Sequence, residues 1–418
     1  MRKSQNIHVV NIDYDVVIIG GSANGSQAAY IAAKHGLSVA VIEEHPTTGL
    51  PEHCSGLFSY WGLDQLDSMP PDDIIFNHDI YGSRIIAPNG KEMTVRKSER
   101  HAIVCDRAAF DRFLLDRAVT EGAELYQPYR AMTATRTEDG VRTEARSRDG
   151  DRIELNSHLL ISAEGIRAGI AEQLGLSGPD PEKFVNAAQF YMHGLKGVDP
   201  ELVEVYQSHE YAPDFFAWLI PMSEDSAKIG LGTSKKGASK ELQKMIENHP
   251  VLKKRCEGAE IRRKTAGRIP TTGAVKKTYA DNVMLVGDVA GQTKPTTGGG
   301  VILGGIGGQI AGEVAAEAVE ANRFDAKFLK RYQKRWKKEM ATNLRRMQLV
   351  RNYMNVLTDE EVDDFFNQLE TKGILKDIEK YGHVDDQGTL VRKFMTTFSL
   401  YPFYLKTSGR LLKSLFTS

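Results

Sequence analysis

The N-terminal part of the chain combines residue types that suit the binding of a pyrophosphate. The segment DYDVVIIGGSANGSQAAYIAAKHGLSVAVIEEH indicates a buried strand, a glycine turn, a helix and a second strand. Gly20 permits the tight turn and Gly25 lets the helix pack closely, while Asn24 lies at the helix N-terminus, whose N–H groups attract phosphate. Glu43 ends the second strand, where a carboxylate can accept hydrogen bonds from a ribose. The complete unit predicts a dinucleotide site, although Ser22 replaces the middle glycine of the usual pattern.

Three later stretches carry residues that would complete such a site. Arg107 begins a predicted helix, CDRAAFDRFLLDRAV, and Glu164 follows a strand in LISAEG. Asp288 directly follows the strand NVMLVG, and the glycine-rich loop PTTGGGV then leads into a helix with Gly300 and Val301 at its start. A carboxylate directly after a strand can accept hydrogen bonds from sugar hydroxyls. A glycine-rich loop can bring backbone N–H groups close to an electron-rich ring of a ligand.

A cysteine is the candidate for acid–base chemistry. Cys54 lies in the loop PEHCSGLFS, and a thiol that is mostly protonated at neutral pH can donate a proton. His53 is a second, weaker candidate. The alternative for Cys54 is a small packed side chain, since free cysteine is among the most buried residue types.

The aromatic stretch FFAWLIPMSEDSAKIGLGT predicts a strand, a turn and a second strand. Alternate residues of a strand face the same side, so Phe216, Trp218 and Ile220 can form one wall of an apolar pocket, with Pro221 ending the strand. A core strand of a sheet is the other interpretation, and the two are compatible.

Composition excludes several classes of protein. The chain has 418 residues, of which 41% are apolar and 26% charged, as in soluble globular proteins. No apolar run is long enough for a membrane span, and the first residues lack signal-peptide features. Three scattered cysteines argue against a disulfide framework or a metal site, so we expect a cytoplasmic protein without bound metal. The net charge of −1 argues against nucleic-acid binding, although Arg323 to Arg351 is strongly basic.

Together these stretches resemble the single-Rossmann flavoproteins typified by p-hydroxybenzoate hydroxylase, a resemblance that implies FAD as the cofactor. Matched position by position, the resemblance implies the following contacts. Asn24 and its neighbours hold the pyrophosphate, Glu43 the adenosine ribose, Arg107 the flavin chain, Ala131 the adenine, Asp288 the ribityl or pyrophosphate oxygens, and Gly300 and Val301 the isoalloxazine. Glu164 departs from the family, which usually has aspartate there.

Over nearly the whole chain the sequence is similar to archaeal geranylgeranyl reductases of the digeranylgeranylglycerophospholipid type. Their Y-x-W-x-F-P pattern and following G-x-G match the aromatic stretch, and their cysteine loop places Cys54, Ser55 and Leu57 beside the flavin. The resemblance implies FAD-dependent reduction of isolated C=C bonds in geranylgeranyl diphosphate or the phospholipid, with Cys54 donating the proton. No second nucleotide-binding motif is evident, so electrons would come from docked NAD(P)H or a protein such as ferredoxin.

Four alternatives remain open. Flavin halogenases carry W-x-W-x-I-P, which reads here as Phe216-x-Trp218-x-Ile220-Pro221 and lacks the first tryptophan. An aromatic hydroxylase would need oxygen and normally NAD(P)H. A quinone side-chain prenyl reductase would differ only in substrate. A non-enzymatic flavin-binding module would make the cysteine loop unnecessary.

The expected fold is α/β (α+β overall), with a single Rossmann-type FAD-binding domain, an inserted antiparallel-sheet substrate domain and a helical C-terminal region. We expect the FAD-binding domain at 1–182 and 265–325, the substrate domain at 183–264, and the helical domain at 326–418. The terminal segment FMTTFSLYPFYLKTSGRLLKSLF mixes aromatic and basic residues and predicts peripheral membrane contact.

Overall fold

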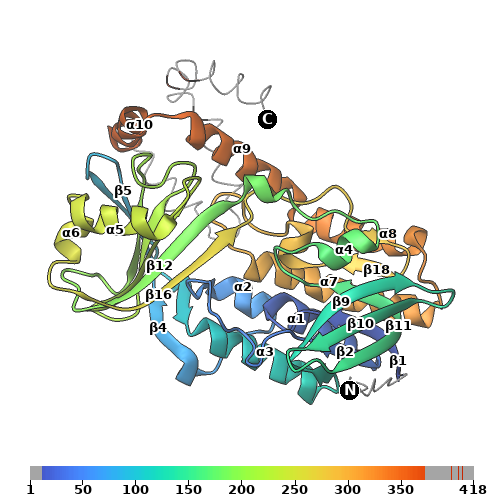
Figure 1. Cartoon of the computed structure of the whole chain (residues 1–418). Coiled ribbons are helices and arrows are strands. Elements are labelled where there is room, and N and C mark those ends of the chain that lie inside the picture. Colours follow the sequence, from blue (N-terminus) through green and yellow to red (C-terminus); the bar gives the residue numbers. More distant parts are fainter. Residues whose placement is uncertain (1–11, 372–396, 398–402, 404–406, 408–418) are drawn as a thin grey trace, which may run out of the picture.

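The computed structural model describes residues 12–371 together with residues 397, 403 and 407. A large sheet with its covering helices lies beside a second sheet, and the helices α9 and α10 extend along the edge of both (Figure 1). This arrangement confirms the expected α/β fold class with a second, mainly antiparallel sheet and a helical C-terminal region.

The larger sheet is the Rossmann-type unit that the sequence predicts. Its order is β17-β18-β11-β1-β2-β8, in which the five strands from β18 to β8 are parallel and β17 is antiparallel to β18. The β9–β10 hairpin continues from β11 in antiparallel fashion. The strands are β1 (Ile12–Ile19), β2 (Val39–Ile42), β8 (Glu124–Tyr126), β9 (Tyr129–Arg136), β10 (Val141–Ser147), β11 (Arg152–Ser162), β17 (Tyr279–Ala280) and β18 (Val283–Leu285).

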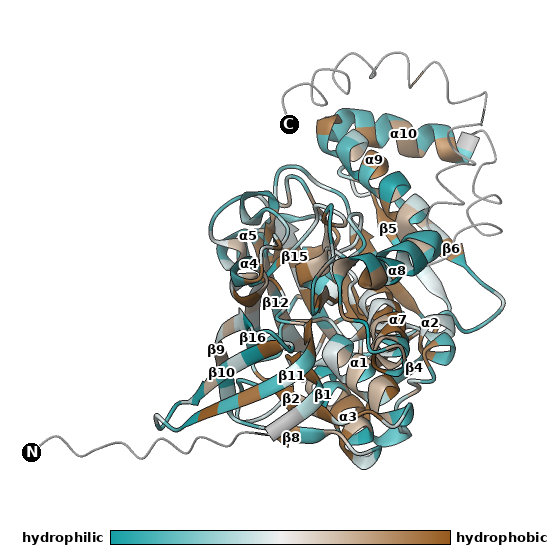
Figure 2. Ribbon diagram, turned by 90° about the vertical axis from the view of Figure 1, so that its right-hand side faces the viewer, coloured by the Kyte–Doolittle hydropathy of each residue, from teal (hydrophilic) through white to brown (hydrophobic). Residues whose placement is uncertain are grey.

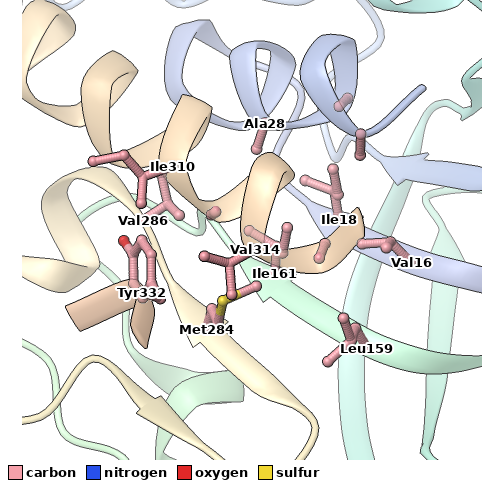
Figure 3. Close-up of a cluster of buried hydrophobic side chains, with 14 of the residues drawn as sticks. Val16, Ile18, Ala28, Leu159, Ile161, Met284, Val286, Ile310, Val314 and Tyr332 are labelled. Carbon is pink, nitrogen blue, oxygen red and sulfur yellow. The ribbon is translucent and has the colours of Figure 1, made fainter. Parts of the chain in front are cut away.

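Helices pack on this sheet through small residues. The helices are α1 (Ala23–Lys34), α3 (Arg107–Thr120), α7 (Val301–Glu320) and α8 (Ala326–Trp336). A Cβ on Gly308 of α7 would lie 2.5 Å from the Asn24 carbonyl oxygen, so only glycine lets α7 approach α1 this closely. Figure 3 shows the resulting core, in which Ala28 of α1, Val314 of α7 and Tyr332 of α8 lie with strand residues such as Ile18.

The second sheet has seven strands in the order β16-β12-β15-β14-β13-β5-β6, all antiparallel except the parallel pair β13–β5. The strands are β5 (Gly82–Ile86), β6 (Glu92–Arg96), β12 (Val185–His193), β13 (Leu202–Tyr206), β14 (Ala217–Pro221), β15 (Ser226–Thr233) and β16 (Glu260–Ile269). The short helices α5 (Ala238–Asn248) and α6 (Leu252–Arg255) share its apolar core. Strands β5 and β6 come from the segment expected in the FAD-binding domain, and β16 extends past residue 264.

Smaller elements connect the two sheets. A three-stranded sheet has the order β3-β7-β4, from β3 (Leu57–Ser59), β4 (Ile75–Ile80) and β7 (Ala102–Cys105). The short helical segments are α2 (Tyr60–Gln65), η1 (Asp72–Ile74), α4 (Gly169–Gln173), η2 (Pro181–Lys183) and η3 (Gly287–Ala290).

The C-terminal helices connect both units. Helix α8 continues through a π-helical turn, η4 (Lys337–Ala341), into α9 (Thr342–Val356), and α10 (Asp359–Thr371) follows. Phe366 of α10 packs against Met93 of β6, so this arm adds a small core at the edge of the second sheet. Figure 2 shows hydrophilic and hydrophobic residues mixed along α9 and α10. Within the described residues, no helix combines the length and apolar character needed to span a membrane.

Candidate FAD and substrate site

The glycine turn between β1 and α1 has the backbone geometry of a phosphate-binding turn. Gly20 has a φ of +100°, and a Cβ there would lie 2.4 Å from the Ala163 carbonyl oxygen. A Cβ on Gly25 would lie 1.9 Å from the Gly20 carbonyl oxygen, so both positions require glycine. The first hydrogen bond within α1 joins the Ser26 N–H to the Ser22 carbonyl oxygen. The preceding N–H groups of Asn24 and Gly25 therefore point out of the helix end.

Glu43 supports this turn from the end of β2. Its Oε2 accepts the N–H of Gly21 at 2.8 Å, and its Oε1 accepts both the N–H and the ring Nδ1 of His45 at 2.8 Å. The carboxylate is buried and already has protein donors on both oxygens. Its predicted contact with a ribose therefore stays a prediction, alongside an observed role in bracing the glycine turn.

Arg107 reaches the same place through a residue that the sequence reasoning missed. Arg107 begins α3, and its Nε donates to Asp111 Oδ1 at 3.0 Å; the same oxygen accepts the N–H of Ala23 at 3.1 Å. Asp111 thus connects α3 to the first turn of α1. Burial raises the pKa of Asp111, although Arg107 acts in the opposite direction. The spacing of four residues from Arg107 was the available signal.

Cys54 lies near Arg107, and its predicted place beside the flavin stays a prediction. The Cys54 Sγ accepts the N–H of Gly56 at 3.5 Å, and this side chain lies near the Arg107 guanidinium. Cys54 packs in one apolar cluster with Val301 at the start of α7. The structure therefore brings together the cysteine loop, the start of α3 and the glycine-rich loop before α7.

The neighbouring residues of the cysteine loop have local roles. Ser55 Oγ accepts the N–H of Leu57 at 3.4 Å, and Leu57 begins β3. A Cβ on Gly56, which has a φ of +72°, would lie 2.2 Å from the Cys105 carbonyl oxygen. The loop is thus held tightly on β7, which fixes the position of Cys54.

Asp288 and the glycine-rich loop form the other wall. Asp288 Oδ1 accepts the Thr293 hydroxyl at 2.8 Å, and a Cβ on Gly300 would lie 2.8 Å from that same oxygen. Burial raises the pKa of Asp288, while Thr293 and the Arg107 charge lower it. The close approach explains why glycine stands at position 300.

Asn24 lies between two further glycines. A Cβ on Gly287 or Gly304 would lie 2.4 Å or 2.2 Å from Asn24 Nδ2. The Asn24 Oδ1 is buried and has no hydrogen-bond partner among the described residues. An unmatched amide oxygen beside a helix N-terminus, Arg107 and a buried acid suits a ligand that carries both phosphates and hydroxyls.

Two predicted positions lie at the periphery of this arrangement. Ala131 is in β9, two residues after Tyr129, whose N–H donates to the Glu43 carbonyl at 2.8 Å. Its predicted adenine contact is compatible with this place but stays a prediction. Glu164 accepts the Ser162 hydroxyl and the N–H groups of Ile170 and Ala171 between 2.8 and 3.0 Å, which makes it a cap for α4.

The aromatic strand β14 faces the cysteine loop through a hydrogen-bonded relay. Trp218 Nε1 donates to Gln189 Oε1 at 3.1 Å, and Gln189 Nε2 donates to the Cys54 carbonyl oxygen at 3.4 Å. The Trp218 ring lies against β15, because a Cβ on Gly230 would come within 2.5 Å of it. Gln189, on β12, was not a sequence candidate.

The alternation predicted for this strand is present. The rings of Phe216 and Trp218 have centroids 5.9 Å apart, and Ile220 packs in one cluster with Trp218. Pro221 ends the strand, where its carbonyl accepts from Asn77 Nδ2 at 3.2 Å. Phe216, Trp218 and Ile220 therefore share a face, and whether that face contacts substrate stays a prediction.

A buried charge network lies next to Cys54 and was also missed. Lys228 is fully buried, and its Nζ lies 3.3 Å from Glu52 Oε1 and 3.1 Å from the Cys105 carbonyl oxygen. Glu52 also bonds Arg263. Burial lowers the pKa of Lys228, and the charge of Glu52 opposes that shift. Only the folded chain shows this network, because its members lie on three separate segments.

An open cleft of about 650 Å³ borders this network, between the cysteine loop and β16. His53 contributes to the lining of this cleft. A Cβ on Gly267 would lie 3.5 Å from the Cβ of His53. Most of the charged side chains around the cleft are basic or histidine: His45, His53, Arg148, Arg263 and Lys264. This face is therefore suited to anionic groups.

Comparison with protein families matches residues 13–304 to the FAD binding domain family. The chain is 34% identical to digeranylgeranylglycerophospholipid reductase 2 of Methanothermobacter thermautotrophicus, with 86% of this chain and 93% of the relative covered. It is 32% identical to digeranylgeranylglycerophospholipid reductase of Methanocaldococcus jannaschii, covering 85% and 90%.

Solved structures show the same fold. A geranylgeranyl bacteriochlorophyll reductase-like protein from Thermoplasma acidophilum has a TM-score of 0.82 at 24% identity, covering 97% of this chain and 99% of that one. A flavin-dependent brominase has a TM-score of 0.71 at 19% identity, covering 93% and 99%. At these identities the likeness concerns the fold alone, so the brominase gives no support for halogenation.

The residues present fit FAD. The glycine turn and the α1 N-terminus suit its pyrophosphate, Asn24 and Asp288 offer acceptors for hydroxyl groups, and the glycine-rich loop leaves backbone exposed to a ring. The family match and the two archaeal relatives, each at 30% identity or more over most of the chain, agree with this geometry. The chain therefore belongs to the digeranylgeranylglycerophospholipid reductase family of FAD-binding proteins.

Proposed function

We propose that this protein uses FAD to reduce the isolated C=C bonds of geranylgeranyl chains in the biosynthesis of isoprenoid membrane lipids. The substrate is either geranylgeranyl diphosphate or digeranylgeranylglycerophospholipid. The observation that carries the proposal is the similarity along most of the chain to reductases whose names state this phospholipid.

The geometry supports the same reaction. An isolated alkene in a polyprenyl chain offers no polar handle, so it must be held by apolar and aromatic surface. The face of Phe216, Trp218 and Ile220 offers such a surface, and the relay through Gln189 fixes it relative to the Cys54 loop. The substrate wall and the thiol are thereby held by one set of hydrogen bonds.

Reduction of an alkene requires a hydride at one carbon and a proton at the other. Bound FAD, when reduced, supplies the hydride. We assign the proton to the Cys54 thiol, which lies near the Arg107 guanidinium. The apolar wall excludes water, which would otherwise compete for the proton-transfer position.

We further infer that electrons come from reduced ferredoxin or NAD(P)H, and that the protein is cytoplasmic with peripheral membrane contact. The basic cleft beside β16 and the basic residues before Arg351 support an anionic donor. The terminal segment that predicts membrane contact lies outside the described residues, apart from Thr397, Phe403 and Thr407. Flotation with anionic liposomes tests this part; a variant truncated at residue 395 that still floats would contradict it.

An anaerobic single turnover tests the reaction. The protein-bound flavin is reduced with dithionite, a geranylgeranyl lipid is added, and flavin absorbance and product mass are followed together. We expect the absorbance spectrum of oxidised flavin to return and the lipid to gain hydrogen atoms in pairs. A spectrum that stays bleached until oxygen is admitted would favour a hydroxylase or halogenase instead.

Cys54→Ala tests the proton donor. The variant is expected to retain FAD and lose most alkene reduction, because Cys105, the other thiol of this cluster, is fully buried and burial raises its pKa to about 12. Cys256→Ala is the matched control, since Cys256 is a free cysteine buried in the core of the seven-stranded sheet. Equal single-turnover rates for wild type and Cys54→Ala would remove Cys54 from the mechanism.

A further inference from the structure

Arg351 of α9 is a buried cation at the junction of the C-terminal helices and the candidate site. Arg351 is only 8% exposed to solvent. Its Nη1 donates to the Pro295 carbonyl oxygen at 3.2 Å, and its guanidinium carbon lies 5.2 Å from the centre of the Phe215 ring. Pro295 belongs to the glycine-rich loop, and Phe215 immediately precedes the aromatic wall. Figure 1 shows α9 running between the two units.

The neighbours of Arg351 place it close to the reacting centre. Phe215 is held between the two walls: a Cβ on Gly232 of β15 would lie 2.4 Å from its ring, and a Cβ on Gly298 would lie 3.5 Å from its tip. The guanidinium therefore contacts the glycine-rich loop directly at Pro295 and lies one aromatic ring away from Gly298, in the loop that is expected to hold the isoalloxazine. A group bound by Arg351 would lie at the edge of the space between these walls.

The charge of Arg351 lacks a matched anion. A guanidinium has five N–H donors, and the contacts described for Arg351 use one of them. Within the described part of the chain it forms no ion pair; Asp214 acts on it only at longer range. Burial lowers the pKa of Arg351 to about 10, and Asp214 opposes that shift. A buried cation without an ionic partner is unfavourable, so this position suits an anionic ligand.

We propose that Arg351 binds the phosphate of the prenyl lipid substrate and so positions the head-group end of the chain beside the glycine-rich loop. Planar guanidinium donors match phosphate oxygens, and the desolvated surroundings strengthen such a contact. The first double bond of a geranylgeranyl chain lies close to the oxygen that carries the head group. An anchor at Arg351 would therefore hold that double bond near the aromatic wall and Cys54. This inference rests on the proposed function and identifies the head-group site within it.

Binding to the FAD-loaded protein tests this anchor without turnover. Geranylgeranyl phosphate, geranylgeraniol and inorganic phosphate are titrated separately, and the perturbation of the oxidised flavin spectrum or the heat of binding gives the affinities. Arg351→Gln is expected to weaken binding of geranylgeranyl phosphate about 10- to 100-fold and to change geranylgeraniol affinity less than about twofold. Arg345→Gln is the matched control, because Arg345 lies exposed on the same helix.

The outcomes separate the anchor from other roles. If Arg351→Gln weakens the binding of geranylgeranyl phosphate and geranylgeraniol equally, Arg351 only supports the loop at Pro295. If the affinity for geranylgeranyl phosphate is unchanged in this variant, the proposal is likewise overturned. Inorganic phosphate that binds wild type as strongly as geranylgeranyl phosphate would indicate a free-anion site instead. Arg351→Met, which keeps the apolar stem, provides a second variant if Arg351→Gln does not retain FAD. A selective loss of phosphate-lipid affinity without any alkene reduction in wild type would support the anchor while contradicting the proposed reaction.

Discussion

The buried ion pair of Lys228 and Glu52 predicts that its two partners respond unequally to mutation. Lys228 is fully buried and Glu52 is 5% exposed, so water screens neither charge. If Glu52 loses its charge, Lys228 keeps only the Cys105 carbonyl and the rings of Tyr191 and Phe76, whose centres lie 5.1 and 5.2 Å from Nζ. If Lys228 loses its charge, Glu52 keeps its ion pair with Arg263.

The magnitudes follow from that difference. Removing one partner of a buried pair costs about 3–5 kcal/mol, so Glu52→Gln is expected to lower the free energy of unfolding by about that amount. Lys228→Met is expected to cost about 1–3 kcal/mol, chiefly because the Cys105 carbonyl loses its donor. The double variant removes the stranded cation and should be more stable than Glu52→Gln alone.

Urea denaturation at neutral pH, followed by tryptophan fluorescence, measures these differences. Lys196→Met is the control: its Nζ lies 3.0 Å from Glu257, but both side chains are exposed, and no measurable change is expected. Equal losses for the two single variants, or a double variant no more stable than Glu52→Gln, would refute the asymmetry and with it the claim that Lys228 is charged in the fold.

Other contacts predict outcomes of different kinds. Gly304→Ala is expected to abolish FAD retention, because its Cβ would lie 2.2 Å from Asn24 Nδ2; flavin content per chain measures this. Glu164→Ala is expected to lower the free energy of unfolding by about 1 kcal/mol through loss of the α4 cap, with FAD content unchanged; loss of FAD would make Glu164 a cofactor residue instead. Burial alone would raise the Glu52 pKa, but Lys228 and the other donors hold it below 4.5. Its stabilisation is therefore complete above about pH 4.5 and is lost as the pH falls through the lower folded-state pKa, so Glu52→Gln should lose less stability than wild type over that acid range.

The glycine turn and the position of Glu43 directly after β2 were predictable from the sequence because all their parts are local. A strand, a turn, a helix and a second strand follow one another from Ile12 to Ile42, and each has its own pattern of apolar spacing and glycine. The aromatic strand was predictable for the same reason. Its wall depends on simple alternation, and Phe216 and Trp218 do lie on one face.

Residues that act across long sequence separations could not be predicted. Asp111 bonds Ala23 across 88 positions, and Gln189 bonds the Cys54 carbonyl across 135. Nothing in periodicity or spacing identifies such partners, since they depend on which sheets pack together. The membership of β5 in the second sheet was missed because its parallel pairing with β13 leaves no hairpin signal.

The acid at Glu164 shows a different limit. A carboxylate between a strand and a helix has the same sequence appearance whether it binds a ligand or caps the helix. The structure shows the cap contacts to Ile170 and Ala171, which account for this residue locally.

The π-helical turn between α8 and α9 accommodates one extra residue without changing the direction in which the rest of the arm faces. Such a turn holds one residue more than an α-helical turn, and each α-helical residue rotates the direction of a side chain by about 100°. Before the turn, Trp336 faces the Rossmann core; after it, Arg351 faces Pro295 and Phe215. Deleting one residue from Lys337–Ala341 would therefore restore a regular helix and leave Arg351 facing much the same way, whereas deleting one residue from α9 before Arg351 would turn that side chain by about 100° and take it away from the loop. Within this family, a one-residue difference in length should therefore be tolerated at this turn but not between the turn and Arg351.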